Sequence, residues 1–310
     1  QYDMGSEINL GATLITKEFR QLKIGTELAD LLGGYDLWET RGLWVWAKPK
    51  AAELSLEFST DDRKHWKLTP KASVRKYNNK GSEYLIDFLG IINTGTKVAL
   101  SANIKGSWES NRTGWASNET FMADDTGWMI GNMSISPDNL GQTDFTAFND
   151  NGSLESILAG VKEYQPGLYY VPVFGTRDTR SLDFTLRGSL TLSSKLSMQL
   201  YSQLFVARGR YDNFSILTDP DNMIAFGDYP KRRDFNYKNL HSNFVTRWEY
   251  RPGSAIYFVW SHSRSRDDEL NPLAPWGESL YEQSVGSQIS DVFKVFPGNS
   301  LMVKIDYAFH

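Results

Sequence analysis

Long segments in which apolar and polar residues alternate strictly run through much of this chain of 310 residues. In LDFTLRGSLTL, residues 182–192, leucine and phenylalanine alternate with charged or small polar residues. After a turn at residues 193–195, LSMQLYSQLFV repeats the pattern over residues 196–206. A period of two places successive side chains on opposite faces of a β-strand. The two segments therefore predict a β-hairpin with one apolar and one polar face.

The length of these segments and of their connections favours strands that cross a membrane. They run for about 10 to 13 residues, against about 5 to 6 in soluble domains. Short turns at residues 60–65, 92–96, 193–195 and 251–254 alternate with long connections at 17–42, 110–179, 209–239 and 265–299, with a short link near Asn78 as an exception. Short periplasmic turns and long external loops are typical of outer-membrane barrels.

We therefore predict an all-β fold, a transmembrane antiparallel β-barrel of about 10–14 strands, even in number, that forms one domain over residues 1–310. Further strands are expected in KIGTELADL and GLYYVPVF. The carboxyl terminus is expected to face the periplasm of a bacterial outer membrane. The alternative is a soluble sandwich in which the apolar faces of two sheets pack together.

The composition agrees with this interpretation. No window reaches the roughly 18 apolar residues of a transmembrane helix, whereas lumen-facing polar residues lower the mean hydropathy of a barrel, here −0.43. Aromatic residues make up 14% of the chain, as two interfacial girdles require. Cysteine is absent, which excludes disulfides and thiolate metal sites. The net charge of −4 gives no reason to propose nucleic acid as a partner.

Alternation assigns individual side chains to the two faces. The polar residues expected to face the lumen are Arg75, Glu83, Asp87, Lys97, Lys105, Asp183, Arg187, Arg247, Glu249 and Lys304. The aromatic residues expected at the membrane interfaces are Phe58, Trp66, Tyr84, Trp108, Trp248, Tyr250, Tyr307 and Phe309. The terminal set Ile305, Tyr307 and Phe309 is the expected barrel-assembly signal, although His310 follows where an aromatic residue usually ends the chain.

Two stretches in the predicted external loops carry apolar residues at helical spacing. One covers residues 154–161 and the other residues 285–296, where Pro297 and Gly298 follow. Such helices could form a lid or plug in the mouth of the barrel. Alternatively, they could pack the loops against one another.

The sequence offers no set of residues for catalysis. The four histidines, His65, His241, His262 and His310, have no spacing that pairs them with a nucleophile or a metal ligand, and no hydrolase or phosphate-loop motif occurs. DPDN at 219–222 could gather oxygen ligands for calcium, but it lacks the glycine and glutamate of an EF-hand, and a solvated loop is the simpler interpretation. We expect no enzyme activity, cofactor or metal.

Several segments resemble a large uncharacterised outer-membrane family common in Bacteroidota. They are NFVTRWEYRPGSAIYFVWSHSRS, RRDFNYKNL, LMVKIDYAF, WETRGLWVWAKPKAAELSLEFSTDDRKHW and SMQLYSQLFVARGRYDNF. The resemblance implies a carboxyl-terminal barrel domain, usually preceded by a carbohydrate-binding module similar to family nine. Nothing in this chain resembles that module, so we expect the chain to be the carboxyl-terminal part of a longer protein. The family supplies no catalytic residues.

Three functions remain open at this point. A plugged or narrow barrel could be a passage for small polar solutes or a membrane anchor. It could instead be a structural or accessory component of an outer-membrane complex. The third possibility, an outer-membrane hydrolase, would need His241 or His262 beside a serine and a carboxylate. The expected partners are outer-membrane lipids and lipopolysaccharide, the barrel-assembly machinery and other surface proteins.

Overall fold

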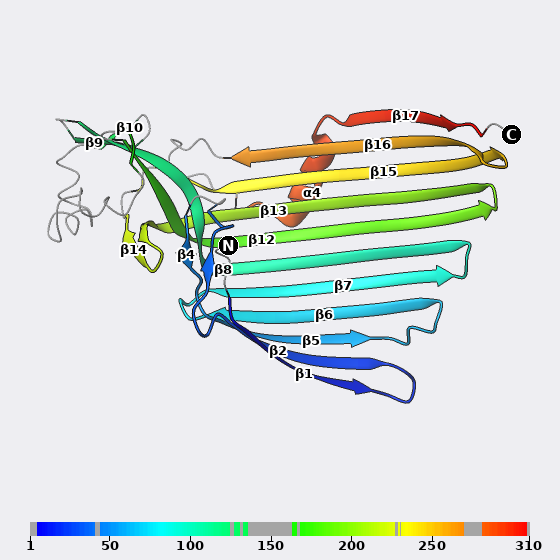
Figure 1. The fold of residues 1–310 in the computed structure, drawn as a ribbon, viewed down its shortest axis with the longest axis horizontal. Helices are drawn as coiled ribbons and strands as arrows, with labels where there is room; N and C mark the ends of the chain where they lie inside the picture. Colours follow the sequence, from blue (N-terminus) through cyan, green and yellow to red (C-terminus); the bar gives the residue numbers. More distant parts are fainter. Residues whose placement is uncertain are drawn as a thin grey trace.

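The computed structural model describes residues 5–40, 44–124, 127–130, 133–135, 163–165, 168–226, 229, 231–269 and 281–308. Within them lies one large antiparallel sheet, drawn in Figure 1. Its main strands are β1 (Glu7–Ile15), β2 (Gln21–Ala29), β5 (Ala51–Ser59), β6 (Trp66–Tyr77), β7 (Ser82–Thr94), β8 (Val98–Asp124), β12 (Leu168–Ser193), β13 (Leu196–Asp219), β15 (Phe235–Arg251), β16 (Ser254–Glu269) and β17 (Gly298–Asp306).

Each main strand pairs with the next one along the chain, so the sheet is an eleven-strand meander with β1 and β17 as its edges. Short strands extend it: β9 (Gly127–Ile130), β10 (Met133–Ile135), β11 (Glu163–Gln165) and β14 (Asn222–Ala225). A separate two-stranded sheet joins β3 (Tyr35–Asp36) and β4 (Trp46–Ala47). The all-β antiparallel fold is confirmed, and the eleven main strands fall within the predicted range of about 10–14. That the total is even stays a prediction, because β1 and β17 do not pair with each other.

All the tight turns of the meander except the one between β6 and β7 lie at one end of the sheet. Figure 1 shows the turns between β1 and β2, β5 and β6, β7 and β8, β12 and β13, and β15 and β16 at the right, and the other connections at the left. This is the asymmetry predicted from the sequence, including the short link between β6 and β7 on the long-loop side. We call the two sides the turn end and the loop end.

The strands extend further toward the loop end than alternation predicts. β2 and the first part of β12 confirm the further strands expected in KIGTELADL and GLYYVPVF. The second half of β8 and the last part of β13 were not expected, because they lie in residues 110–179 and 209–239, which were predicted as long connections. The reason is burial on both faces. Consecutive residues Val173 and Phe174 are both 0% exposed, and a strand covered on both sides loses the apolar–polar period.

Between this buried region and the turn end, one face of the sheet is apolar and uncovered. In register across it lie Leu56, Ala72, Ile86 and Gly106 in one row, and Phe88 and Ile104 in the next. Ile86 is 55% exposed and Ile305, on the edge strand, is 63% exposed. Among the described residues no second large sheet packs on this outward face. The sandwich alternative is therefore wrong for this part of the chain.

The aromatic residues predicted for the interfaces lie at both ends of the outward face. Those exposed to solvent are Phe58, Trp66, Tyr84, Trp108, Trp248 and Tyr307. Tyr250 is half-buried, with its ring 6.3 Å from that of Trp248. Phe309 lies outside the described residues, so the barrel-assembly set is described only at Ile305 and Tyr307.

One helix, α4 (Val285–Lys294), connects β16 to β17 and confirms the helical spacing of residues 285–296. Ser284 caps it by accepting a hydrogen bond from the Ser287 amide at 3.1 Å, and Lys294 lies in the last turn, where a cation is favoured. The other predicted helix, at 154–161, falls outside the described residues. The described helical part of the chain contains no segment long and apolar enough to span a bilayer.

Candidate functional site

The face opposite the apolar one carries the charged side chains. One row across it reads Lys23, Glu57, Lys71, Asp87, Lys105 and Asp183 by strand register. Charges of alternating sign therefore lie opposite one another on six neighbouring strands, an arrangement that cross-strand pairing favours. Lys23 and Glu57 form an ion pair at 2.9 Å. We call this side the polar face.

Register places the other predicted lumen residues on the same face. Arg75 lies opposite Glu83, Arg187 opposite Tyr201, and Tyr257 lies between Arg247 and Lys304. Arg247 pairs with Glu249 at 2.9 Å. Lys97 differs, because it lies in the turn before β8 and not within a strand. That these residues line a lumen remains a prediction.

A hollow of about 510 Å³ lies around the strands that carry Arg187. Its lining includes Ser101, Gln199, Tyr201 and Asn243, and the Arg187 guanidinium lies 5.4 Å from the centre of the Tyr201 ring. Apolar side chains such as Ile91, Leu100 and Val245 make up much of the same lining, so the hollow combines one cation and a few hydrogen-bonding groups with an apolar wall.

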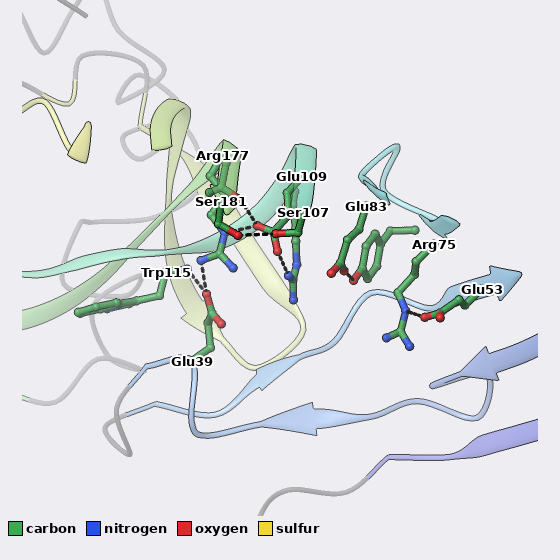
Figure 2. Close-up of polar contacts among 12 residues, drawn as sticks. Glu39, Glu53, Arg75, Glu83, Ser107, Glu109, Trp115, Arg177 and Ser181 are labelled. Carbon is green, nitrogen blue, oxygen red and sulfur yellow. Dashed lines mark hydrogen bonds and ion pairs between the residues drawn. The ribbon is translucent and has the colours of Figure 1, made fainter. Parts of the chain in front are cut away.

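At the loop end, ion pairs on the polar face form a continuous network, shown in Figure 2. Arg177 contacts Glu39 at 2.9 Å and Glu109 at 3.3 Å. Glu109 also accepts hydrogen bonds from Arg112 and, at 2.8 Å, from the Thr179 hydroxyl. Glu109 and Arg112 belong to β8, and Arg177 and Thr179 belong to β12, whereas Glu39 belongs to the segment before β5. The network therefore fastens that segment to the sheet.

A second group of ion pairs, partly drawn in Figure 2, joins β2, β5 and β6. Arg75 on β6 contacts Glu53 on β5 at 2.8 Å, as Figure 2 shows. It also contacts Glu27 on β2 at 2.6 Å. Nearby, the Tyr77 hydroxyl donates to Glu83 at 3.2 Å. One arginine thus compensates two carboxylates that face each other across β2 and β5, which would otherwise repel.

The described residues between β2 and β5 are 30–40 and 44–48, which together we call segment 30–48. They reach across to strands that are not their neighbours in the sheet. The ring centres of Trp46 and Phe174 lie 5.1 Å apart, and Leu217 completes this buried cluster with Trp44, Trp115 and Met223 packed around it. The Ala47 amide donates to the Pro220 carbonyl at 2.6 Å. Because β6 and β7 separate β5 from β8 in the sheet, segment 30–48 spans two strands to make these contacts. Its Glu39 meets Arg177 on the polar face at the loop end.

A buried polar cluster lies near the end of β8. Glu119 accepts hydrogen bonds from Ser117 at 2.7 Å, Lys231 at 2.6 Å and Tyr229 at 2.5 Å, and Arg233 contacts both Glu119 and the Tyr229 hydroxyl. Burial, and then the Glu119 charge, raise the pKa of the Tyr229 phenol. The carboxylate is compensated by two cations, as a buried charge requires.

The described histidines make contacts without a carboxylate or serine partner. His241 bonds to Asn243 at 2.8 Å, and His262 bonds to Asn299 at 3.0 Å and to Arg264 at 3.1 Å. Asp219 accepts hydrogen bonds from the Asp221 amide and the Asn222 side chain, so DPDN forms a turn with internal bonds. Within the ranges that the structure describes, no group of three or more possible metal ligands occurs.

Sequence reasoning missed the residues that close the loop end. Glu39, Glu109 and Arg177 were not singled out, and neither were Trp44 and Trp46. Glu39 and Arg177 are separated by 138 positions, and neither stands in an alternating segment. Only the density of tryptophan in GLWVWAK gave a local sign that this connection has a packed core of its own.

Comparisons with known proteins give a family and a structural likeness. Residues 159–308, just under half of the chain, match a family described as a domain of unknown function, DUF5916. No curated protein matches. Among solved structures, the NanC porin in a rhombohedral crystal form is similar to the chain with a TM-score of 0.24 and 7% identity, over 84% of this chain and 83% of that one. A likeness at this level carries no argument about function.

Proposed function

We propose that this chain forms part of an outer-membrane β-barrel, in which lipid contacts the outward face and the polar face lines the lumen. The observation that carries the proposal is the uncovered apolar face. Large side chains such as Leu56, Ile104 and Leu301 are exposed on strand after strand, while charges gather on the opposite face. Monomeric soluble proteins rarely expose an apolar patch of this extent.

Closure of this sheet requires strands beyond the eleven described. β1 and β17 stand at odd positions in the antiparallel order and therefore run in the same direction, as their arrows in Figure 1 indicate. Unpaired backbone groups are costly in hydrocarbon. An odd number of further strands between β1 and β17 would satisfy both edges with antiparallel pairs.

Within this barrel, segment 30–48 would restrict a passage for small polar solutes. Glu39 and Arg177 hold it over the polar face at the loop end of β12, the strand whose half nearer the turn end carries the 510 Å³ hollow. The predicted stopper was a helix in an external loop; the better candidate is this non-helical segment. The competing function is a membrane anchor or accessory component, whose lumen conducts nothing.

Single-channel recording in a planar bilayer separates these functions. Glu39→Gln removes the charge that holds segment 30–48 to Arg177, and we expect larger or more frequent conductance steps than in the wild type. Glu57→Gln is the matched control, because it breaks the Lys23–Glu57 pair on the same face without a contact to the segment. Silence of all three proteins would contradict the passage and favour the anchor.

A further inference from the structure

Helix α4 and residues 281–284 before it lie on the outward face of the sheet, not over its polar face. Gln288, which is 1% exposed, accepts a hydrogen bond from Arg208 at 2.9 Å and donates to Asn236 at 2.6 Å. Arg208 and Asn236 are opposite one another on β13 and β15, in the row that begins with Tyr84, Trp108 and Arg180. Two of those residues belong to the exposed aromatic set at the loop end.

This row places two arginines directly opposite each other. Arg180 on β12 pairs in register with Arg208 on β13. Arg208 is only 4% exposed; its guanidinium donates to the Gln288 side chain and the Gln283 carbonyl, and its Nε has no hydrogen-bond partner in the described part of the chain. Like charges opposite one another destabilise a sheet, and a buried cation without a counter-charge is costly.

No carboxylate of the described residues forms an ion pair with either arginine. Arg180 is exposed and lies 4.7 Å from the centre of the Tyr281 ring. The neighbouring Arg210 does have a carboxylate partner, Asp178 at 2.8 Å. The charge of Glu282, which lies 3.9 Å from Arg210, also acts on Arg208, but within the described residues neither Arg180 nor Arg208 contacts a carboxylate.

An apolar hollow adjoins Arg180. It measures about 80 Å³ and lies between α4 and the sheet, lined by Gly106, Trp108, Leu182, Val206 and Val285 with Arg180 and Gln288 at its polar side. Its apolar wall continues into the uncovered face, because Leu182 stands in one row with Gly106 and Ile86. One ligand could therefore place an anion on the arginines and a hydrocarbon chain along this wall.

We propose that the exposed Arg180 binds the phosphorylated headgroup of an outer-leaflet lipid of the lipid A class, with the buried Arg208 adding its charge from beneath α4 and an acyl chain along Trp108 and Leu182. The inference rests on the proposed membrane-spanning function and adds a partner site to it. Charge-assisted hydrogen bonds from arginine suit a phosphate. The apolar wall is what favours a lipid over a free phosphate ion.

The end of α4 fits the same placement. Phe296 is 91% exposed and Phe293 is also exposed, next to the exposed cation of Lys294. Arg264 on the outward face fixes this end by donating to the Val295 carbonyl at 3.0 Å. Aromatic and basic residues side by side on an exposed helix are typical of a helix that lies in a membrane interface.

The test compares lipid retention by the wild type, Arg180→Gln and Arg187→Gln after reconstitution in phosphatidylcholine vesicles that contain lipid A. Arg187 is the matched control: it is an exposed arginine on the same strand but on the opposite face, without an ion pair in the described residues. Bound lipid is counted by native mass spectrometry. We expect about tenfold weaker lipid A retention for Arg180→Gln, as for the loss of a charge-assisted hydrogen bond, and no change for Arg187→Gln.

Two further arms need no variant. Dephosphorylated lipid A should bind the wild type more weakly than lipid A, and equal binding would overturn the proposal. In the variant experiment above, equal losses of lipid A from Arg180→Gln and Arg187→Gln would overturn it too. Binding of inorganic phosphate without retention of lipid A would overturn the lipid source. If the wild type spans the vesicle membrane but shows no preference for lipid A, this inference alone fails, whereas failure to insert contradicts the proposed function.

Discussion

The two faces of the sheet differ in what their side chains contact. On β7, Phe88 points outward and is 41% exposed, with Ile104 beside it in register. Its neighbour Asp87 points to the polar face, where it lies between Lys71 and Lys105. Around Phe88 the apolar groups of the outward face have no partner among the described residues, whereas charges of opposite sign lie next to one another in this row of the polar face. The proposed barrel explains the difference by two solvents, hydrocarbon on one side and water on the other.

The largest expected effect comes from placing a charge on the outward face. Phe88→Arg should lower the free energy of unfolding in lipid vesicles by about 2–4 kcal/mol, because an arginine near the bilayer midplane loses its hydration. Leu89→Arg, one residue further along and on the polar face, should cost less than about 1 kcal/mol since its guanidinium can reach water. Denaturant titrations of both variants in vesicles measure the difference. Equal costs would break the comparison between the faces.

A smaller effect is expected within the polar face itself. Arg177→Gln leaves the carboxylates of Glu39 and Glu109 without their shared cation, and should cost about 1–3 kcal/mol at this partly exposed site. The loss of structure in Arg177→Gln should be confined to segment 30–48. Hydrogen exchange of the Ala47 amide, which bonds to Pro220, should accelerate in Arg177→Gln.

Arg75→Gln provides the control for that variant. Arg75 also compensates two carboxylates, Glu27 and Glu53, but all three belong to neighbouring strands. It should destabilise the sheet without changing the exchange of Ala47. Faster exchange in both variants would show that segment 30–48 depends on the whole polar face and not on its own ion pair.

The smallest effect concerns a turn that belongs to neither face. The Arg63 side chain, which bonds to Asp61 at 3.0 Å in the turn between β5 and β6, lowers the pKa of that carboxyl to about 2. A lowered pKa stabilises the fold above the ordinary value of 3.8, and this contribution is lost as the pH falls through about 2. Unfolding midpoints of the wild type and Asp61→Asn should differ above pH 3.8 and converge toward pH 2. A constant difference across this range would contradict the assignment.

Alternation predicts the part of the fold where one face is apolar and the other polar. The hairpin of β12 and β13 is present with the predicted turn at residues 193–195 and with Leu186 and Leu200 on the outward side. Beyond Arg180 the same strands continue, yet the pattern disappears because Val173 and Phe174 are both buried. Sequence periodicity therefore predicts a strand only as far as its two faces meet different surroundings.

The candidate site could not be predicted in the same way. Glu39 meets Arg177, and Arg180 meets Arg208, through register and through the path of a connection, neither of which a single sequence encodes locally. The helical spacing of residues 285–296 predicted α4 correctly. Its position on the outward face depends on polar residues such as Asn236 and Arg264, which interrupt the apolar rows there.

The most direct test of the central claim is the environment of successive residues on β7. The chain has no cysteine, so single-cysteine variants at each position from Tyr84 to Gly90 can carry one nitroxide spin label in lipid vesicles. If the outward face contacts lipid, collision of the label with oxygen, which concentrates in hydrocarbon, should be most frequent at Tyr84, Ile86 and Phe88. Collision with a water-soluble nickel chelate should be highest at the positions between them. Equal access of the chelate to both sets of positions would contradict a lipid-facing side of this sheet.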